Sequence, residues 1–195
     1  GWSIAQPELF WDAVWDFTGV IGDKGARILT DGGLMPGAAF FPDARLNFAE
    51  NLLRGEGSEI ALHFNNEGEM REPMTRAALR RDVARLAAVL KSWGVTEGDR
   101  VAAFMPNCPE VIVAMLAAAS IGAVFSSCSP DFGAKGVLDR FGQIEPKVLI
   151  ACDGYRYAGK VLPAHDKLAE IIEGLPTLEH VAVVPFIGEG PKGLA

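Results

Sequence analysis

The chain has 195 residues, of which 49% are hydrophobic and 22% are charged, and its formal net charge is -7. This length can enclose one well-buried core, and the composition excludes a disordered or fibrous chain. The acidic balance provides no electrostatic footprint for a phosphate backbone or anionic lipid, so neither nucleic acid nor a membrane is an expected partner.

The first 57 residues predict a helix followed by an arm that wraps a larger body. Ser3 can cap a helix whose first turn tolerates Pro7, and apolar residues recur at helical spacing as far as Phe17. Residues 32–54 have few periodic apolar positions, which predicts an extended arm, with a short helix at residues 46–53. We interpret the first helix as docked on the body, and a partner-binding helix is the alternative.

Residues 58–186 predict an α/β subdomain that begins with a β-hairpin. Apolar residues at 60–64 and their return at 70–74 flank a turn-forming sequence. Thr75 then caps a long helix that ends at Gly94. The basic residues of this helix are interrupted by an acid, so we interpret them as a solvated face, not a nucleic-acid surface.

Strands and helices alternate through the rest of this region. Apolar strands are predicted at residues 101–105, 124–125, 147–151 and 181–184, with helices at 110–121, 133–144 and 165–173. This alternation predicts an α/β fold with a mostly parallel sheet. Residues 187–195 have the composition of a linker.

One apolar run raises the question of a membrane span. Residues 111–130 contain no charged side chain, but Gly122 and several serines interrupt them. We therefore predict a buried helix followed by a buried strand. The odd number of cysteines, Cys108, Cys128 and Cys152, argues against a disulfide framework and favours a reducing, cytoplasmic location.

The sequence holds no complete catalytic or metal-binding motif. The histidines His63, His165 and His180 are far apart, without other ligands at metal-binding spacing, and no phosphate-binding GxxxxGK[ST] motif occurs. Cys128 lacks an identifiable base, so we interpret it as a small buried thiol. We therefore assign no catalytic residue and no metal ligand.

Two stretches could contact a ligand. Ser126 and Ser127 follow Phe125 at a strand end, where small residues permit close approach, although a plain tight turn explains them equally well. Arg156 and Lys160 follow the next apolar strand among tyrosines. An arginine can hold a phosphate bidentately beside an aromatic cover, and a solvated loop is the equal alternative.

The chain resembles the N-terminal part of AMP-forming acyl-CoA synthetases over essentially its whole length. The resemblance is carried by residues 46–53, 98–101, 105–107 and 121–125. Residues 127–133, 139–147 and 153–157 resemble the acetoacetyl-CoA synthetase branch of that family in particular.

The resemblance implies an ATP-dependent reaction in which acetoacetate becomes an acyl-adenylate and CoA then displaces AMP. Members of the family need Mg²⁺, an ATP loop and a catalytic lysine. Neither the loop nor the lysine motif is found here, so we interpret the 195 residues as an N-terminal fragment that is inactive without the remainder of its own chain. Acetate or propionate as the acid, a stand-alone CoA- or nucleotide-binding module, and a purely structural module are the alternatives.

The resemblance also implies a CoA-binding wall. In related enzymes a Phe and two small residues lie along the pantetheine, matching Phe125, Ser126 and Ser127, although the family usually has Gly-Gly at the serines. A Gly-x-Arg-x-x-Arg-like stretch there contacts the adenine and the 3′-phosphate. It matches Gly154, Arg156 and, after one inserted residue, Lys160.

Overall fold

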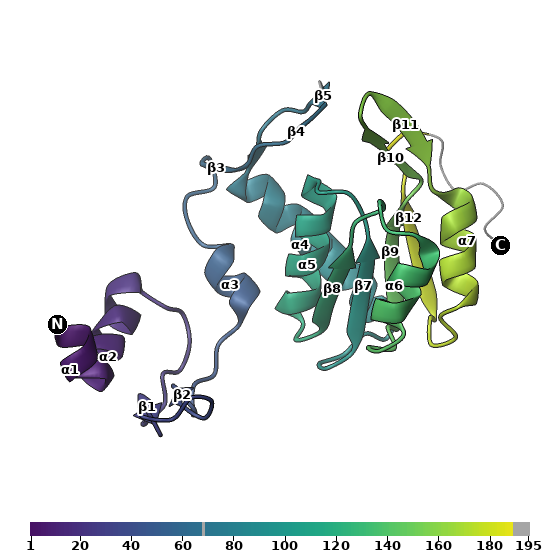
Figure 1. The fold of residues 1–195 in the computed structure, drawn as a ribbon. Helices are drawn as coiled ribbons and strands as arrows, with labels where there is room; N and C mark the ends of the chain where they lie inside the picture. Colours follow the sequence, from purple (N-terminus) through teal and green to yellow (C-terminus); the bar gives the residue numbers. More distant parts are fainter. Residues whose placement is uncertain (68, 189–195) are drawn as a thin grey trace. The chain divides into compact units, whose positions relative to one another are not determined.

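The computed structural model of the chain describes residues 1–67 and 69–188 (Figure 1). Its contacts divide the chain into a first unit, Gly1–Leu52, and a second unit, Leu53–Ala195. The domain boundary predicted after residue 57 lies five residues beyond this division, and the predicted linker at residues 187–195 lies mostly outside the described residues.

The first unit contains two helices at its start instead of one. Helix α1 spans Trp2–Ala5 and α2 spans Pro7–Thr18, with Gln6 as the N-cap of α2 at φ -139°. A residue that precedes proline is disfavoured in the helical region, so the helix breaks before Pro7. The predicted Ser3 cap is therefore wrong, because Ser3 lies inside α1.

The arm of the first unit is partly ordered into regular structure. Strand β1 (Leu29–Thr30) pairs with β2 (Ala39–Phe40) in antiparallel fashion, and the predicted short helix is present as α3, Phe48–Leu52. Lys24 contacts both Asp12 and Asp16 at 2.6 Å, which ties the arm to α2.

The second unit is built on a parallel sheet, as predicted. Its strands are β7 (Arg100–Phe104), β8 (Val124–Cys128), β9 (Val148–Cys152) and β12 (His180–Val184). They are ordered β12-β9-β7-β8, and every neighbouring pair is parallel. All five residues of β9 are buried, which explains its uninterrupted apolar sequence.

Helices cover this sheet. They are α4 (Arg76–Ser92), α5 (Pro109–Ser120), α6 (Ala134–Phe141) and α7 (His165–Glu173). Thr75 caps α4 as predicted, since its hydroxyl accepts the Ala78 N–H at 3.2 Å. Helices α6 and α7 bury Phe141 and Leu168 against Phe104 and Leu149, and these residues belong to one hydrophobic core cluster.

Two antiparallel hairpins accompany the sheet at one end of the second unit (Figure 1). The predicted first hairpin is present in two steps: β3 (Ile60–Leu62) pairs with β6 (Met74–Thr75), and β4 (Asn65–Asn66) pairs with β5 (Glu69–Met70). The second hairpin joins β10 (Gly154–Tyr157) to β11 (Lys160–Pro163), and the sequence predicted a loop there.

The loop prediction failed because a two-residue hairpin turn was not recognised. Ala158 and Gly159 both have positive φ, 51° and 72°, the signature of the type I′ turn that closes hairpins. We refer to β10, this turn and β11 together as the cationic ribbon, after Arg156 and Lys160.

The uncharged run at residues 111–130 forms most of α5, a short turn and β8. The predicted buried helix is confirmed by α5. The predicted buried strand is wrong, because only Cys128 of β8 is buried and β8 lies at the end of the described strand order. Within residues 1–67 and 69–188, no helix combines the length and the apolar character required to cross a membrane.

Candidate functional site

The candidate ligand residues lie on segments that reach or follow the carboxyl edge of the parallel sheet. Strand β8 supplies Phe125, Ser126 and Ser127, and the cationic ribbon follows β9 after the single residue Asp153. In open α/β sheets, ligands bind beyond this edge. Because β7 alone separates β8 from β9, the two segments begin on neighbouring parts of one surface.

Phe125, Ser126 and Ser127 lie within β8, so the alternative of a plain tight turn at these serines is wrong. They are paired with consecutive residues of β7, with Ser126 opposite Ala102 and Ser127 opposite Ala103. Side chains alternate along a strand. Ser126 therefore shares the face of Ala102, which belongs to the α6–α7 core, whereas Phe125 and Ser127 share the other face.

A ligand on one face of β8 can thus contact the side chains of Phe125 and Ser127 or the side chain of Ser126, but not all three. Ser127 is exposed and Phe125 is half-buried, and they lie on the same face. Among the described residues, β8 is an edge strand whose only partner is β7. Phe125, Ser126 and Ser127 can therefore all contact one ligand through the backbone along the outer edge of β8.

The register of the cationic ribbon separates the two predicted cations. Arg156 pairs with Val161, and Tyr157 pairs with Lys160. Directly opposite residues share a face and successive residues alternate, so Arg156 and Lys160 project from opposite faces of the ribbon. Both are exposed. A single phosphate can meet both side chains only at an end or an edge of the ribbon.

Gly154 has a packing role in this structure. A Cβ atom placed on it would lie 2.5 Å from Cδ1 of Ile187 and 2.7 Å from the carbonyl oxygen of Leu162. Glycine is therefore required for the close approach of these two residues at the start of β10. Ligand contact through Gly154 stays a prediction.

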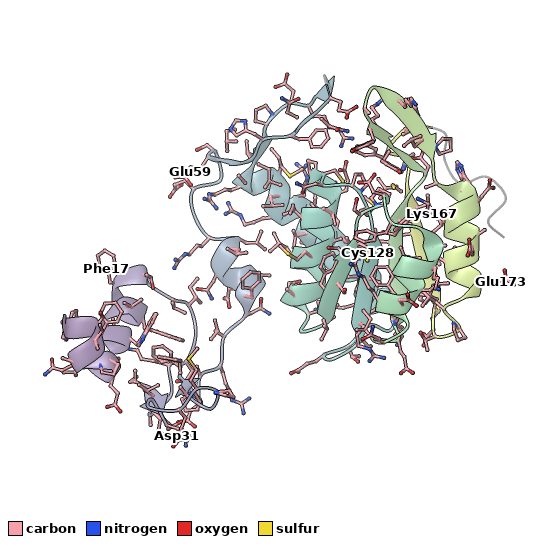
Figure 2. All side chains as sticks on the ribbon, in the orientation of Figure 1. Phe17, Asp31, Glu59, Cys128, Lys167 and Glu173 are labelled. Carbon is pink, nitrogen blue, oxygen red and sulfur yellow. The ribbon has the colours of Figure 1, made fainter. Side chains whose placement is uncertain are left out.

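A polar cluster connects the turn after β8 to the cationic ribbon. The Tyr155 hydroxyl hydrogen-bonds Asp131, and burial, followed by this carboxylate, raises the pKa of Tyr155. Ser129 Oγ donates to Asp131 Oδ2 at 3.0 Å. Lys167 of α7 donates to the carbonyl oxygen of Pro130 at 2.6 Å. Figure 2 labels Lys167 on α7.

Asp153 fixes the junction between β9 and the cationic ribbon. It is fully buried, and its Oδ1 accepts the Ile187 N–H at 2.8 Å. Its backbone N–H donates to the Val184 oxygen at 3.1 Å, and its carbonyl accepts the Ala164 N–H at 2.9 Å. One residue therefore ties together the ends of β9 and β12 and the residue before α7.

The buried cysteines are not equipped for nucleophilic chemistry. All three are free and buried, as the sequence predicted for Cys128. Burial raises the pKa of both Cys108 and Cys152 to about 12, which keeps them protonated at neutral pH. Cys128 lies 3.8 Å from Nη1 of Arg140.

Asp131, Asp153 and Lys167 were not predicted from the sequence as parts of this region. A Ser-Pro-Asp sequence at residues 129–131 was a signal for a side-chain-stabilised turn, because Ser and Asp bond to nearby backbone groups there. Asp153 had a weaker signal, an acidic residue directly after an apolar strand. Nothing in the local sequence of Lys167 indicates its contact with residue 130.

A family model described as "AMP-binding enzyme" matches residues 49–192. The chain belongs to this AMP-binding enzyme family. The match confirms the family resemblance found in the sequence, and it includes β8 and the cationic ribbon of this AMP-binding chain.

Within the AMP-binding family, the chain is similar to two named CoA synthetases. The chain is 51% identical to the acetoacetyl-coenzyme A synthetase of Rhizobium meliloti (strain 1021), covering 96% of this chain and 29% of that protein. It is 37% identical to the malonamoyl-CoA synthetase vrtB of Penicillium aethiopicum, covering 94% of this chain and 26% of that protein.

A solved structure of an acetoacetyl-CoA synthetase is also similar to this chain. The acetoacetyl-CoA synthetase from Streptomyces lividans matches with a TM-score of 0.92 and 46% identity, covering 98% of this chain and 30% of that structure. The chain thus spans less than a third of the length of these AMP-binding relatives.

Proposed function

We propose that this chain supplies the CoA-binding wall of an AMP-forming acid–thiol ligase that acts on acetoacetate. The observation that carries the proposal is the 51% identity to an acetoacetyl-coenzyme A synthetase over 96% of the chain. In the proposed reaction, the acid carboxylate attacks ATP to give an acyl-adenylate and pyrophosphate, and the CoA thiol then displaces AMP.

The acid belongs to a small chemical class. Acetoacetate and malonamate, the acids implied by the names of two relatives, each carry a carbonyl group at the carbon next but one to the carboxylate carbon. We propose this 3-carbonyl acid as the substrate class. Malonamate is the second candidate, and acetoacetate is favoured by the higher identity of its relative.

The wall of this chain would hold CoA at two places. Phe125, with Ser126 and Ser127, would lie along the pantetheine arm at the outer edge of β8. Arg156 and Lys160 of the cationic ribbon, which starts at Gly154, would meet the 3′-phosphate and the adenine. The polar cluster around Asp131 and Tyr155 supports the proposal, because it connects these two segments.

ATP and Mg²⁺ are the other small molecules of the proposed reaction, and CoA is its thiol substrate. Among the described residues, no three His, Cys, Asp or Glu side chains lie close enough together to hold a metal ion. We therefore assign no magnesium ligand to this chain. The three free cysteines are the basis for proposing a reducing, cytoplasmic location.

The test compares the two half-reactions in the enzyme that contains this chain. We expect Arg156→Ala to raise the KM for CoA about 10- to 100-fold, the effect of one charge-assisted hydrogen bond of about 1.5–3 kcal/mol. Acetoacetate-dependent pyrophosphate release should stay unchanged, because the first half-reaction does not involve CoA.

Arg85→Ala is the matched control, since it removes a cation from an exposed side chain on α4. Equal damage to both half-reactions by Arg156→Ala would contradict the CoA assignment. Acetate or propionate turned over faster than acetoacetate and malonamate would contradict the acid class. CoA binding without pyrophosphate release would instead favour a binding module. The absence of both CoA binding and pyrophosphate release would favour a structural module.

A further inference from the structure

The turn of the cationic ribbon is occupied by a carboxylate from the other hairpin. Oε1 of Glu67 accepts the Ala158 N–H at 2.7 Å, and Oε2 accepts the Gly159 N–H at 2.8 Å. Glu67 follows β4 directly, so a residue 91 positions earlier in the chain caps the end of the ribbon.

The two N–H groups are available because of the turn type. In a two-residue hairpin turn the flanking residues, here Tyr157 and Lys160, close the strand ladder. The amides of Ala158 and Gly159 take no part in that ladder. Successive backbone N–H groups that converge on one point form an anion-binding concavity. In this structure, the anion bound there is the Glu67 carboxylate.

The two predicted cations flank this turn in the chain. Arg156 and Lys160 project from opposite faces of the ribbon, so the end of the ribbon is a position at which both long side chains can meet one anion. Arg156 lies two residues before Ala158, and Lys160 directly follows Gly159. The two backbone donors are therefore flanked by one cation on each face of the ribbon.

We propose that Glu67 is an internal occupant of this end of the ribbon and must leave before a phosphate monoester binds there. The carboxylate satisfies both amides while no ligand is bound. A phosphate offers more acceptor oxygens and a larger negative charge than a carboxylate, so it can replace Glu67 and engage the cations as well. The proposal deepens the proposed function and rests on it for the 3′-phosphate of CoA as the natural ligand.

The experiment is a titration of the chain with adenosine 3′,5′-bisphosphate, followed by the amide NMR signals of Ala158 and Gly159. Adenosine, which has no phosphate, is the matched ligand. If Glu67 occupies the turn for about 90% of the time, its removal strengthens apparent binding about tenfold. We expect that gain in Glu67→Ala and a similar gain in Glu67→Gln, for the bisphosphate only.

Glu72→Gln is the control variant, because it makes the same charge change at another exposed carboxylate, and its affinity should equal that of the unmodified chain. Weaker or unchanged binding in both Glu67 variants would overturn the proposal, as would bisphosphate binding that leaves the two amide signals unmoved or no binding at all. A second measurement compares CoA with dephospho-CoA in the intact enzyme. If the NMR results are as expected but the enzyme does not prefer CoA, the proposed CoA assignment is overturned and the phosphate site still stands.

Discussion

Strand β9 and the cationic ribbon follow one another in the chain, yet their side chains differ in solvent exposure. All residues of β9 are buried between neighbouring strands and helices. In the ribbon, Arg156, Tyr157, Lys160 and Val161 are exposed. The difference indicates a division of work. The buried sheet holds the fold, and we propose that the exposed ribbon offers groups to a ligand, so substitutions in the two regions should change different measured quantities.

The largest effect is expected in the core. Phe141 of α6 is fully buried, and Phe141→Ala should lower the free energy of unfolding by about 3–5 kcal/mol through the cavity that it leaves. Phe132, which is 39% exposed and stacks 4.0 Å from the Arg140 guanidinium, is the control. Its replacement by Ala should cost about 1 kcal/mol. Urea unfolding measures both, and equal losses would refute the division.

The next largest effect is expected where the sheet meets the ribbon. Asp153→Ala removes the acceptor for the N–H of half-buried Ile187, and losing a hydrogen bond to a charged group costs about 1.5–3 kcal/mol. Asp153→Asn keeps an oxygen at Oδ1 and should lose less. Urea unfolding of the two variants decides the point. Equal losses in the two variants would mean that charge, not the hydrogen bond, secures this junction.

A smaller effect is expected in the turn of the ribbon. Gly159 has φ +72° with nothing within 4 Å of an added Cβ, so Gly159→Ala tests backbone strain alone. It should cost about 1 kcal/mol, the penalty of the left-handed region for a residue with a side chain. Gly33 also has open space but no positive φ. If Gly33→Ala destabilises the chain as much, the strain argument fails.

The same contrast explains what the sequence could predict. Strands β7, β9 and β12 follow from continuous apolar runs, because burial on both faces leaves no polar positions in them. Thr75 follows from local capping chemistry. The ribbon was missed because Ala158-Gly159 is a weaker turn signal than Asn-Gly, although aromatic and apolar residues flank it on both sides.

The candidate site was predicted by resemblance, and its geometry was not. The opposite faces of Arg156 and Lys160 depend on the ribbon register, which cannot be read from a stretch predicted as a loop. The contact of Glu67 with Ala158 spans 91 positions, and no local pattern encodes a contact between hairpin tips. The single break before Pro7 was readable, since proline restricts the residue before it.

The smallest effect is expected at the amino edge of the sheet. Hydrogen bonds from Thr96, with a smaller contribution from Lys147, hold the pKa of Asp99 below its usual value. A lowered folded-state pKa stabilises the fold above the unfolded pKa of about 4, and this stabilisation is lost as the pH falls through the folded value.

Asp99→Asn should therefore be less stable than the unmodified chain near pH 6, and the gap should close towards about pH 3. Urea midpoints across this range measure it. Thr177→Val is a control without a carboxyl group, since it removes a neutral hydrogen bond to the Pro146 oxygen, and its loss should not depend on pH. A gap for Asp99→Asn that widens in acid would contradict the sign of the pKa shift.

The most direct test of the ribbon as a ligand wall is a crystal structure of the enzyme containing this chain with CoA bound. The account requires the 3′-phosphate at the end of the ribbon, within hydrogen-bonding distance of the Arg156 side chain, with Phe125 along the pantetheine and Glu67 displaced from the turn. CoA bound elsewhere, with Arg156 in solvent and Glu67 still on Ala158 and Gly159, would contradict it.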